Sequence, residues 1–268
     1  MERKEIMQSD GLYHCSICGE PTQQRLYVPL FDGTGRKQEM VVHRMCKCQQ
    51  EEEDRKEKQR KYDQDMRVVN ALKAESLMDA RFENARLANY RKTDGNGYAY
   101  EIACRYVNKF ADLLQKGQGL LFMGDVGTGK SYTAACIANE LMYRKYSAIM
   151  TSFIKILAKS GNAGVSEYTV SRLVRPSLLV LDDLGAERST EYAIESVYNI
   201  IDSRYRSGKP LIITTNLTLL EMKDPEDMRY RRIYDRIFEA CYPVQFKGKS
   251  FRKISAVQRF DEMRRWLE

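Results

Sequence analysis

The stretch of the sequence that says most about chemistry is GDVGTGKS at residues 124–131, which fits the pattern G-x-x-x-x-G-K-S and follows the apolar run GLLFM. Glycines in this pattern let backbone N–H groups surround phosphates, and the positive end of the following helix points at them. Lys130 would reach the β- and γ-phosphates, and the Ser131 hydroxyl would be a ligand of Mg²⁺. We therefore predict an ATP site that includes Gly124, Asp125, Val126, Gly127, Thr128, Gly129, Lys130, Ser131 and Tyr132.

A second acidic segment, LLVLDD at residues 178–183, supplies the carboxylates that such a site needs. Four apolar residues predict a buried strand, and Asp182 and Asp183 follow at its carboxyl end. We expect Asp182 to hold Mg²⁺ and Asp183 to polarise the attacking water. Two adjacent carboxylates at the end of a buried strand are costly without a cation, which argues against a purely structural role.

Asn216 ends another apolar run, PLIITTN at residues 210–216. We expect this run to form the strand beside the one that precedes the glycine-rich loop, and the Asn216 side chain to position the lytic water. Asn is also common in turns, so an ordinary turn residue is the alternative.

Four of the seven cysteines lie in the first 48 residues, as CSIC at 15–18 and CKC at 46–48. The residues between them predict two strands joined by the turn DGTG, so the pairs would flank a hairpin as in a zinc ribbon. So short a region builds little core and benefits from a metal. We predict a structural Zn²⁺ held by Cys15, Cys18, Cys46 and Cys48; His43 could replace one thiolate, and four metal-free thiols are the alternative.

The elements that must position these residues can be read from the apolar runs. Strands are expected at 119–123, 147–152, 178–185, 210–216 and 242–246, with helices between them, the first from Lys130 to about 145. Continuous apolar strands that alternate with helices predict an α/β fold with a parallel sheet covered on both faces.

Residues 49–74 are highly charged, with acids placed four residues before bases, the favourable order on a helix. Acids and bases nearly balance, which favours a solvated connecting helix over a DNA-binding one. We therefore divide the chain into a zinc-binding module (1–48), a charged helical linker (49–74) and a nucleotide-binding domain (75–268).

The composition limits the class of protein. The 268 residues are 43% hydrophobic and 30% charged, which is typical of a globular chain with a packed core. No apolar run approaches the length of a membrane span, and the N-terminus lacks a secretory h-region, so we expect a cytoplasmic location and no membrane partner. The net charge of +7 permits contact with nucleic acid without requiring it.

Taken in order, the motifs GDVGTGKS, LLVLDDLGAE, ITTN, RIYDRI and SFRK resemble the AAA+ ATPases of the helicase-loader group, the DnaC/DnaI-type loaders and their relative IstB. The resemblance covers about residues 76–255 and implies an AAA+ P-loop domain. It also implies that Arg236 is an arginine finger acting on a neighbouring subunit, with Arg232 as a second candidate, and that Arg252 contacts nucleotide in its own subunit. Asp183 departs from the glutamate usual in AAA+ proteins, so slow hydrolysis is expected.

The resemblance further implies that single-stranded DNA lines the inner surface of an oligomer. Matching positions are Lys155 and Lys159 on one helix and Thr190 and Tyr192 after the acidic strand. Basic groups follow phosphates and an aromatic ring can stack on a base. Surface lysines and a helix N-cap are the equally good alternative.

These features together favour an ATP-dependent loader of a DnaB-type replicative helicase that self-assembles and binds ATP, Mg²⁺ and Zn²⁺. The nearest alternative is an IstB-like ATPase that helps a DNA transposase. A small P-loop kinase and a non-hydrolysing adaptor are further alternatives.

Overall fold

The structure is a computed structural model that describes residues 4–30, 35–93, 95–160, 165–186, 190–225 and 227–268. It divides into two compact units, Met1–Arg67 and Val68–Glu268. None of the helices in these described ranges is long and apolar enough to span a bilayer.

The first unit consists of two small antiparallel sheets and the start of a long helix. Strand β1 (Glu5–Met7) pairs with β2 (Tyr13–Cys15), and β3 (Gln23–Pro29) pairs with β4 (Lys37–His43). The hairpin expected between the cysteine pairs is thus present as β3 and β4, although most of its predicted turn lies outside the described residues. Helix α1 (Lys47–Glu75) forms the charged connector, which confirms that this segment is helical.

The second unit is built on a five-stranded parallel sheet. Its strands are β5 (Gly119–Gly124), β6 (Ala148–Ser152), β7 (Leu178–Leu184), β8 (Leu211–Thr215) and β9 (Cys241–Phe246), in the spatial order β6-β7-β8-β5-β9. All five expected strands are present within two residues of their predicted ends. As expected, β8 lies beside β5, with Met123 opposite Thr215.

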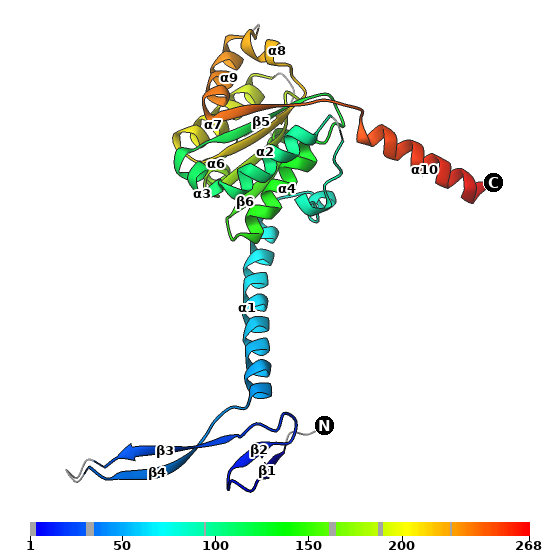
Figure 1. Cartoon of the computed structure of the whole chain (residues 1–268). Coiled ribbons are helices and arrows are strands. Elements are labelled where there is room, and N and C mark those ends of the chain that lie inside the picture. The colour runs from blue at the N-terminus through cyan, green and yellow to red at the C-terminus, as the bar shows by residue number, and fades with distance from the viewer. Residues whose placement is uncertain (1–3, 31–34, 94, 161–164, 187–189, 226) are drawn as a thin grey trace. The chain divides into compact units, whose positions relative to one another are not determined.

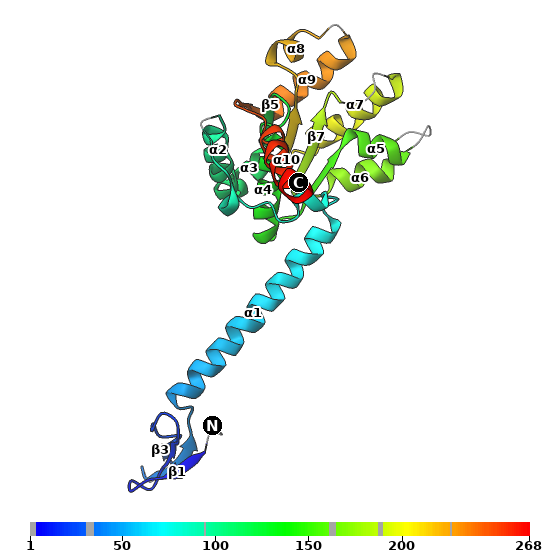
Figure 2. The same cartoon turned by 90° about the vertical axis from the view of Figure 1, so that its right-hand side faces the viewer.

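Helices cover both faces of this sheet, as Figure 2 shows. One face packs against α2 (Gly97–Asn108), α3 (Phe110–Lys116) and α4 (Lys130–Tyr143). The other packs against α5 (Phe153–Ser160), α6 (Glu167–Val174), α7 (Glu191–Arg206) and α9 (Met228–Ala240). Alternate residues of each strand point to opposite faces, so Phe122 joins the first core and Leu121 the second.

Three short elements and a C-terminal helix complete the second unit. Two 3₁₀ turns, η1 (Ala80–Phe82) and η2 (Leu87–Asn89), precede α2, and α8 (Leu219–Lys223) follows β8. Helix α10 (Phe251–Leu267) follows β9 at the C-terminus (Figure 1). The carboxyl ends of β5, β7 and β8 bring the three sequence motifs to one edge of the sheet.

A buried arginine stabilises the opposite edge of the sheet, where β7 and β8 begin. Arg204 of α7 is 0% exposed and donates hydrogen bonds of 2.6–3.2 Å to backbone carbonyls before β7 and β8. The carbonyls belong to Val174, Pro176, Ser177 and Pro210. A guanidinium carries five N–H donors, so one side chain can bond to several backbone carbonyls at this edge.

Candidate ATP site and candidate zinc centre

A cavity of about 360 Å³ lies at the carboxyl edge of the sheet. Of the residues predicted for nucleotide chemistry, those that line it are Val126, Gly127, Gly129, Lys130, Ser131, Tyr132, Asp183, Asn216 and Arg252. Three separate sequence motifs and the start of α10 therefore meet around one space. A volume of this size is typical of small-ligand pockets.

Lys130, the first residue of α4, lies at the centre of the site. Its side chain is only 4% exposed, and Nζ donates hydrogen bonds to Gly124 O (2.7 Å), Asp125 O (2.8 Å) and Asn216 Oδ1 (2.8 Å). Burial lowers the pKa of Lys130, and the charges of Asp183, Asp182 and Asp125 oppose that shift. Its three contacts are neutral oxygens, so phosphate oxygens would be stronger acceptors for this buried ammonium.

The loop itself requires glycine at its tightest point. Gly127 has a φ of 83°, and a Cβ there would lie 2.1 Å from Ser250 Oγ. The Gly127 carbonyl also accepts a hydrogen bond from Phe251 N at 2.9 Å, which joins the start of α10 to the loop. Thr128 is buried and its hydroxyl donates to Asp125 O at 2.8 Å, which braces the loop from within.

Asp182 fits the role of a magnesium ligand. It is 7% exposed and accepts a 2.6 Å hydrogen bond from Thr214 Oγ1. Burial raises the pKa of Asp182, and hydrogen bonds from Thr214 and Ser131 lower it again. The contact with Ser131 brings the two predicted Mg²⁺ ligands together. A buried carboxylate is costly in the charged form, and a bound cation would remove that cost.

Asp183 and Asn216 lie at the ends of neighbouring strands and face the same cavity. Asp183 has a φ of 56°, unusual for a residue other than glycine, and its backbone N–H donates to Thr214 Oγ1 at 2.9 Å. Backbone strain held by such a hydrogen bond is common at functional sites. Asn216 contacts Lys130 through its side chain, so it is more than a turn residue.

Seven residues that line the cavity were not predicted from the sequence: Arg81, Phe82, Asn89, Tyr90, Arg91, Asn96 and Phe251. The first six of these residues carry no phosphate-binding motif, and they reach the site because the chain before α2 crosses α4. Tyr90 OH, for example, lies 2.7 Å from Thr133 Oγ1 of α4. Phe251 could have been noticed as the neighbour of Arg252.

The two candidate arginine fingers lie apart from this cavity, on α9. Arg236 lies near the first residues of β5 and β8, at the opposite edge of the sheet, and forms a 2.6 Å ion pair with Asp202. Arg232 lines a hollow with Glu191 and Arg229, closer to the edge that carries the ATP site. An arginine that acts on a neighbouring subunit need not approach its own nucleotide, so both stay predictions.

The predicted DNA-binding residues occupy different surroundings. Lys155 contacts Asp79, whereas Lys159 is exposed one turn later on α5. Thr190 is the N-cap of α7 and accepts a hydrogen bond from Ala193 N at 3.2 Å. This is the capping role that the sequence analysis gave as the alternative to DNA binding. The hydroxyl of Tyr192 is buried. Of the four, Lys159 is the side chain most available to a phosphate.

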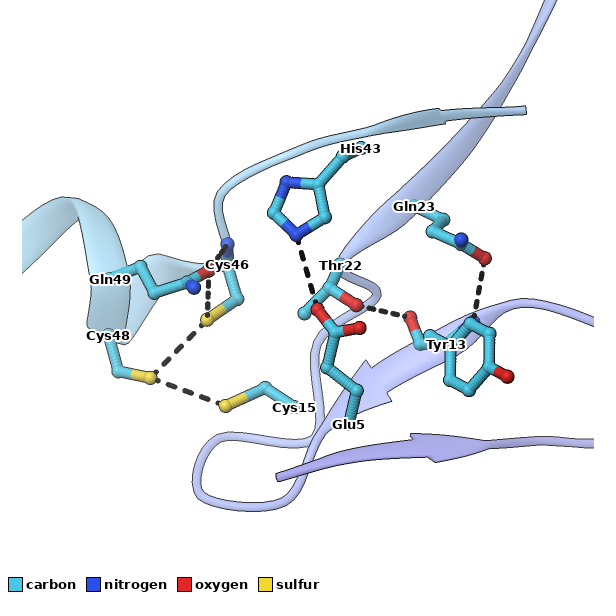
Figure 3. A network of polar contacts seen from close by, with 9 residues as sticks. All are labelled: Glu5, Tyr13, Cys15, Thr22, Gln23, His43, Cys46, Cys48 and Gln49. Carbon is cyan, nitrogen blue, oxygen red and sulfur yellow. Dashed lines mark hydrogen bonds and ion pairs between the residues drawn. The ribbon is translucent and has the colours of Figure 1, made fainter. Parts of the chain in front are cut away.

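In the first unit, the four predicted cysteines come together. The sulfurs of Cys15, Cys18, Cys46 and Cys48 all lie within 4.8 Å of one another. Figure 3 shows three of them, with Cys48 Sγ 3.5 Å from Cys15 Sγ and 3.4 Å from Cys46 Sγ. Tetrahedral Zn–S bonds of about 2.3 Å place sulfurs roughly 3.8 Å apart. The four sulfurs are therefore close enough together to bind one zinc ion.

The hydrogen bonds around the cluster also fit a metal centre. Ile17 N lies 3.4 Å from Cys15 Sγ, and backbone N–H groups of Cys18 and Ile17 lower the pKa of Cys15 to about 6. The neighbouring thiol of Cys46 is the largest of several effects that raise the pKa of Cys48 to about 12. Crowded thiolates repel one another until a cation neutralises them.

The histidines point to other partners. His43 Nε2 lies 3.1 Å from Glu5 Oε1, and Figure 3 shows its ring directed at that carboxylate. His14 uses both ring nitrogens, on Gly19 O at 3.0 Å and Asp10 Oδ2 at 2.9 Å. This arrangement favours four cysteine ligands over a set that includes His43.

The parallel sheet, the glycine-rich loop before α4 and the acidic end of β7 define a P-loop nucleotide-binding domain of the AAA+ ATPase class. The family model of the IstB-like ATP binding proteins matches residues 32–258, and the chain belongs to this family.

Individual relatives include replication proteins, a phage-like element protein and an ATP-binding protein of an insertion sequence. The chain is similar to the replicative helicase loader DnaI of Bacillus subtilis, 27% identical over 150 residues, and to the replicative helicase loader DnaC of Escherichia coli, 31% identical over 146 residues. The matches cover 51% and 52% of this chain and 48% and 58% of those proteins, so they span about half the length of these relatives. The phage-like element PBSX protein XkdC of Bacillus subtilis is 24% identical over 228 residues, 81% of this chain and 79% of that protein.

Solved structures agree with this likeness. The crystal structure of DnaI has a TM-score of 0.56 and 26% identity, and covers 66% of this chain and 97% of that one. The crystal structure of the DnaC helicase loader has a TM-score of 0.53 and 26% identity, and covers 63% of this chain and 100% of that one.

Proposed function

We propose that this protein is an ATP-dependent loader of the replicative DNA helicase onto single-stranded DNA. The observation that carries the proposal is the likeness, in sequence and in fold, to two proteins named as replicative helicase loaders. The two-unit organisation is compatible with it, since a small module and a long helix precede the ATP-binding domain.

ATP would bind with its phosphates in the loop 124–131. Lys130 would exchange its bonds to Gly124, Asp125 and Asn216 for bonds to the β- and γ-phosphates. Asp182 and Ser131 would hold Mg²⁺, which neutralises the phosphates and draws electron density from the bond to be broken.

Hydrolysis would use the two polar residues at the neighbouring strand ends. Asp183 would accept a proton from the attacking water, and the Asn216 amide would orient that water once Lys130 has left it. Asp183 is one methylene shorter than the glutamate usual in AAA+ proteins, so turnover is expected to be slow. A slow ATPase suits a switch that binds, assembles and releases.

Assembly would bring a second subunit to the cavity. Arg252 would contact nucleotide in its own subunit, and Arg236 or Arg232 of a neighbour would complete the site. Guanidinium groups suit this task because they stay charged and bind phosphate oxygens with two N–H groups at once.

The first unit would contact the helicase, with Zn²⁺ on Cys15, Cys18, Cys46 and Cys48 as its structural support. Single-stranded DNA would contact α5 and the start of α7, with Lys159 as the main contact and Lys155, Thr190 and Tyr192 as further contacts.

Size-exclusion chromatography with the cognate replicative helicase tests the proposal. In the presence of ATP we expect this protein to co-elute with the helicase. Lys130→Ala should give a weaker complex or none if ATP binding controls complex formation. No co-elution under any nucleotide condition would contradict the loader function and favour the IstB-like role with a transposase.

A further inference from the structure

Arg81 lies in the ATP cavity, although no phosphate-binding motif contains it. It belongs to η1 and lines the same space as Lys130, Asp183 and Arg252. The side chain is 59% exposed, and its guanidinium carbon lies 4.5 Å from the ring centroid of Phe82. The flat guanidinium is therefore supported on one side by an aromatic ring and exposed to the cavity and solvent on the other.

Asp79 holds Arg81 only loosely. Arg81 Nη2 is 3.9 Å from Asp79 Oδ2, and Asp79 also contacts Lys155 of α5. A guanidinium has five N–H donors, and an ion pair of this length uses few of them. Arg81 can therefore bond to an anion that enters the cavity without first breaking a strong contact.

The path of the chain places Arg81 at the magnesium side of the cavity. Ser76 O accepts a hydrogen bond from Met150 N of β6 at 2.8 Å, and Phe82 O accepts one from Asn139 Nδ2 of α4 at 2.8 Å. Residues 76–82 thus run from the edge strand β6 to α4. Asp79, two residues before Arg81, contacts Lys155 just after β6, and Ser152 at the end of β6 lies opposite Asp182 of β7.

This side of the cavity is where the end of the triphosphate must lie. Asp182 would help to hold the Mg²⁺ that neutralises the end of the triphosphate, and Asp183 would act on the water that attacks the γ-phosphate. Asp182 and Asp183 therefore mark the γ-phosphate end, and Arg81 is close to it. Arg91 lines the cavity from the side of α2. Its carbonyl accepts a 3.1 Å hydrogen bond from Nδ2 of Asn96, the residue just before that helix.

We propose that Arg81 binds the γ-phosphate of ATP within its own subunit and so lets the site distinguish ATP from ADP. Asp79 is a weak positioning residue for it, since its carboxylate lies 3.9 Å from Arg81 Nη2. The inference rests on the proposed ATP-binding function and adds to it a cation that is separate from Lys130, from Arg252 and from an arginine of a neighbour.

The test compares the affinities of the full-length chain for ADP and for a non-hydrolysable ATP analogue, both with Mg²⁺, by fluorescence titration. A charge-assisted hydrogen bond at a half-exposed position is expected to contribute about tenfold in affinity. Arg81→Ala should lower the affinity for the ATP analogue by about this factor and change the affinity for ADP less than about twofold. Arg81→Lys should restore part of the loss, and Asp79→Asn should reduce the preference for ATP to a smaller extent.

Arg91→Ala is the matched control, since it removes a cation from the same cavity but away from the γ-phosphate. It should change the affinities for both nucleotides by the same factor. Melting temperatures near that of the wild type would show that each variant is folded. If the wild type binds both nucleotides and the ratio of the two affinities is unchanged in Arg81→Ala, the proposed role of Arg81 is wrong and the ATP-binding function stands. A wild-type chain that binds neither nucleotide would overturn the ATP-binding function itself.

Discussion

Removing the proposed zinc should unfold the first unit and leave the second intact. Among the described residues before Val68, the buried side chains are His14, Cys15, Thr22 and Cys46, and no large apolar side chain is among them. The hairpin β3–β4 is exposed along both strands. A two-stranded hairpin is marginal in water without a covered face, so another source of stability is needed.

The size of the effect follows from the ligand set. Structural zinc contributes about 10–16 kcal/mol of apparent binding free energy to small metal-dependent folds. Whole domains are stable by only about 5–15 kcal/mol, so loss of the ion exceeds what the module can withstand. Replacing one ligand, as in Cys46→Ser, should have the same effect as a chelator.

Hydrogen–deuterium exchange of the purified chain, with zinc measured by mass spectrometry, is the assay. We expect about one zinc per chain. A strong chelator should remove protection from residues 4–46 and leave the protection of β5–β8 and the affinity for ATP unchanged. His43→Ala is the control: His43 contacts Glu5 and not the sulfurs, so this variant should keep its zinc. A metal-free chain with full protection in residues 4–46 would refute the reasoning.

Three further outcomes are expected. Asp183→Asn should lower ATP turnover about 10²-fold or more with little change in ATP affinity, because it removes the proton acceptor. Unchanged turnover in a steady-state ATPase assay would contradict that role. Arg204→Met should lower the free energy of unfolding by about 3–5 kcal/mol in urea titrations, because four backbone carbonyls lose their hydrogen bonds to the guanidinium. The exposed Arg206→Met should cost under about 0.5 kcal/mol, and equal effects would be inconsistent with the buried network. Lys159→Ala should weaken the binding of single-stranded DNA and lower the salt dependence of the affinity for DNA. Lys155→Ala should have a smaller effect because Asp79 holds that lysine. The reverse order would show that the pair with Asp79 opens on DNA binding.

Much of the fold and the centre of the ATP site could be predicted because their signals are local. Each strand of the sheet is a short apolar run. Asp182 and Asn216 come directly after such runs, and Lys130 ends the glycine-rich loop that follows another. Parallel strands end at the same edge, so three separate motifs had to meet there. The cysteine cluster was predictable for a related reason, since a hairpin returns its two ends to the same place.

Other features depend on contacts between distant segments and leave no pattern in the sequence. The chain before α2 crosses α4 and supplies Arg81 and Tyr90 to the cavity, and nothing near these residues marks them as nucleotide ligands. Nor could the sequence show that Lys155 contacts Asp79, or that Arg236 pairs with Asp202. These pairs alter which charged groups are available to DNA or to a neighbouring subunit, so they affect how the motifs are interpreted.

The most direct test of the central claim is a loading assay on closed circular single-stranded DNA. The cognate helicase is incubated with the circle, ATP and either this protein or its Lys130→Ala variant, and the helicase retained on the circle is measured after gel filtration. A closed circle has no end to thread, so the helicase ring must be opened. We predict that the wild type loads the helicase and the variant does not. Equal retention of helicase with and without this protein would contradict the loader function.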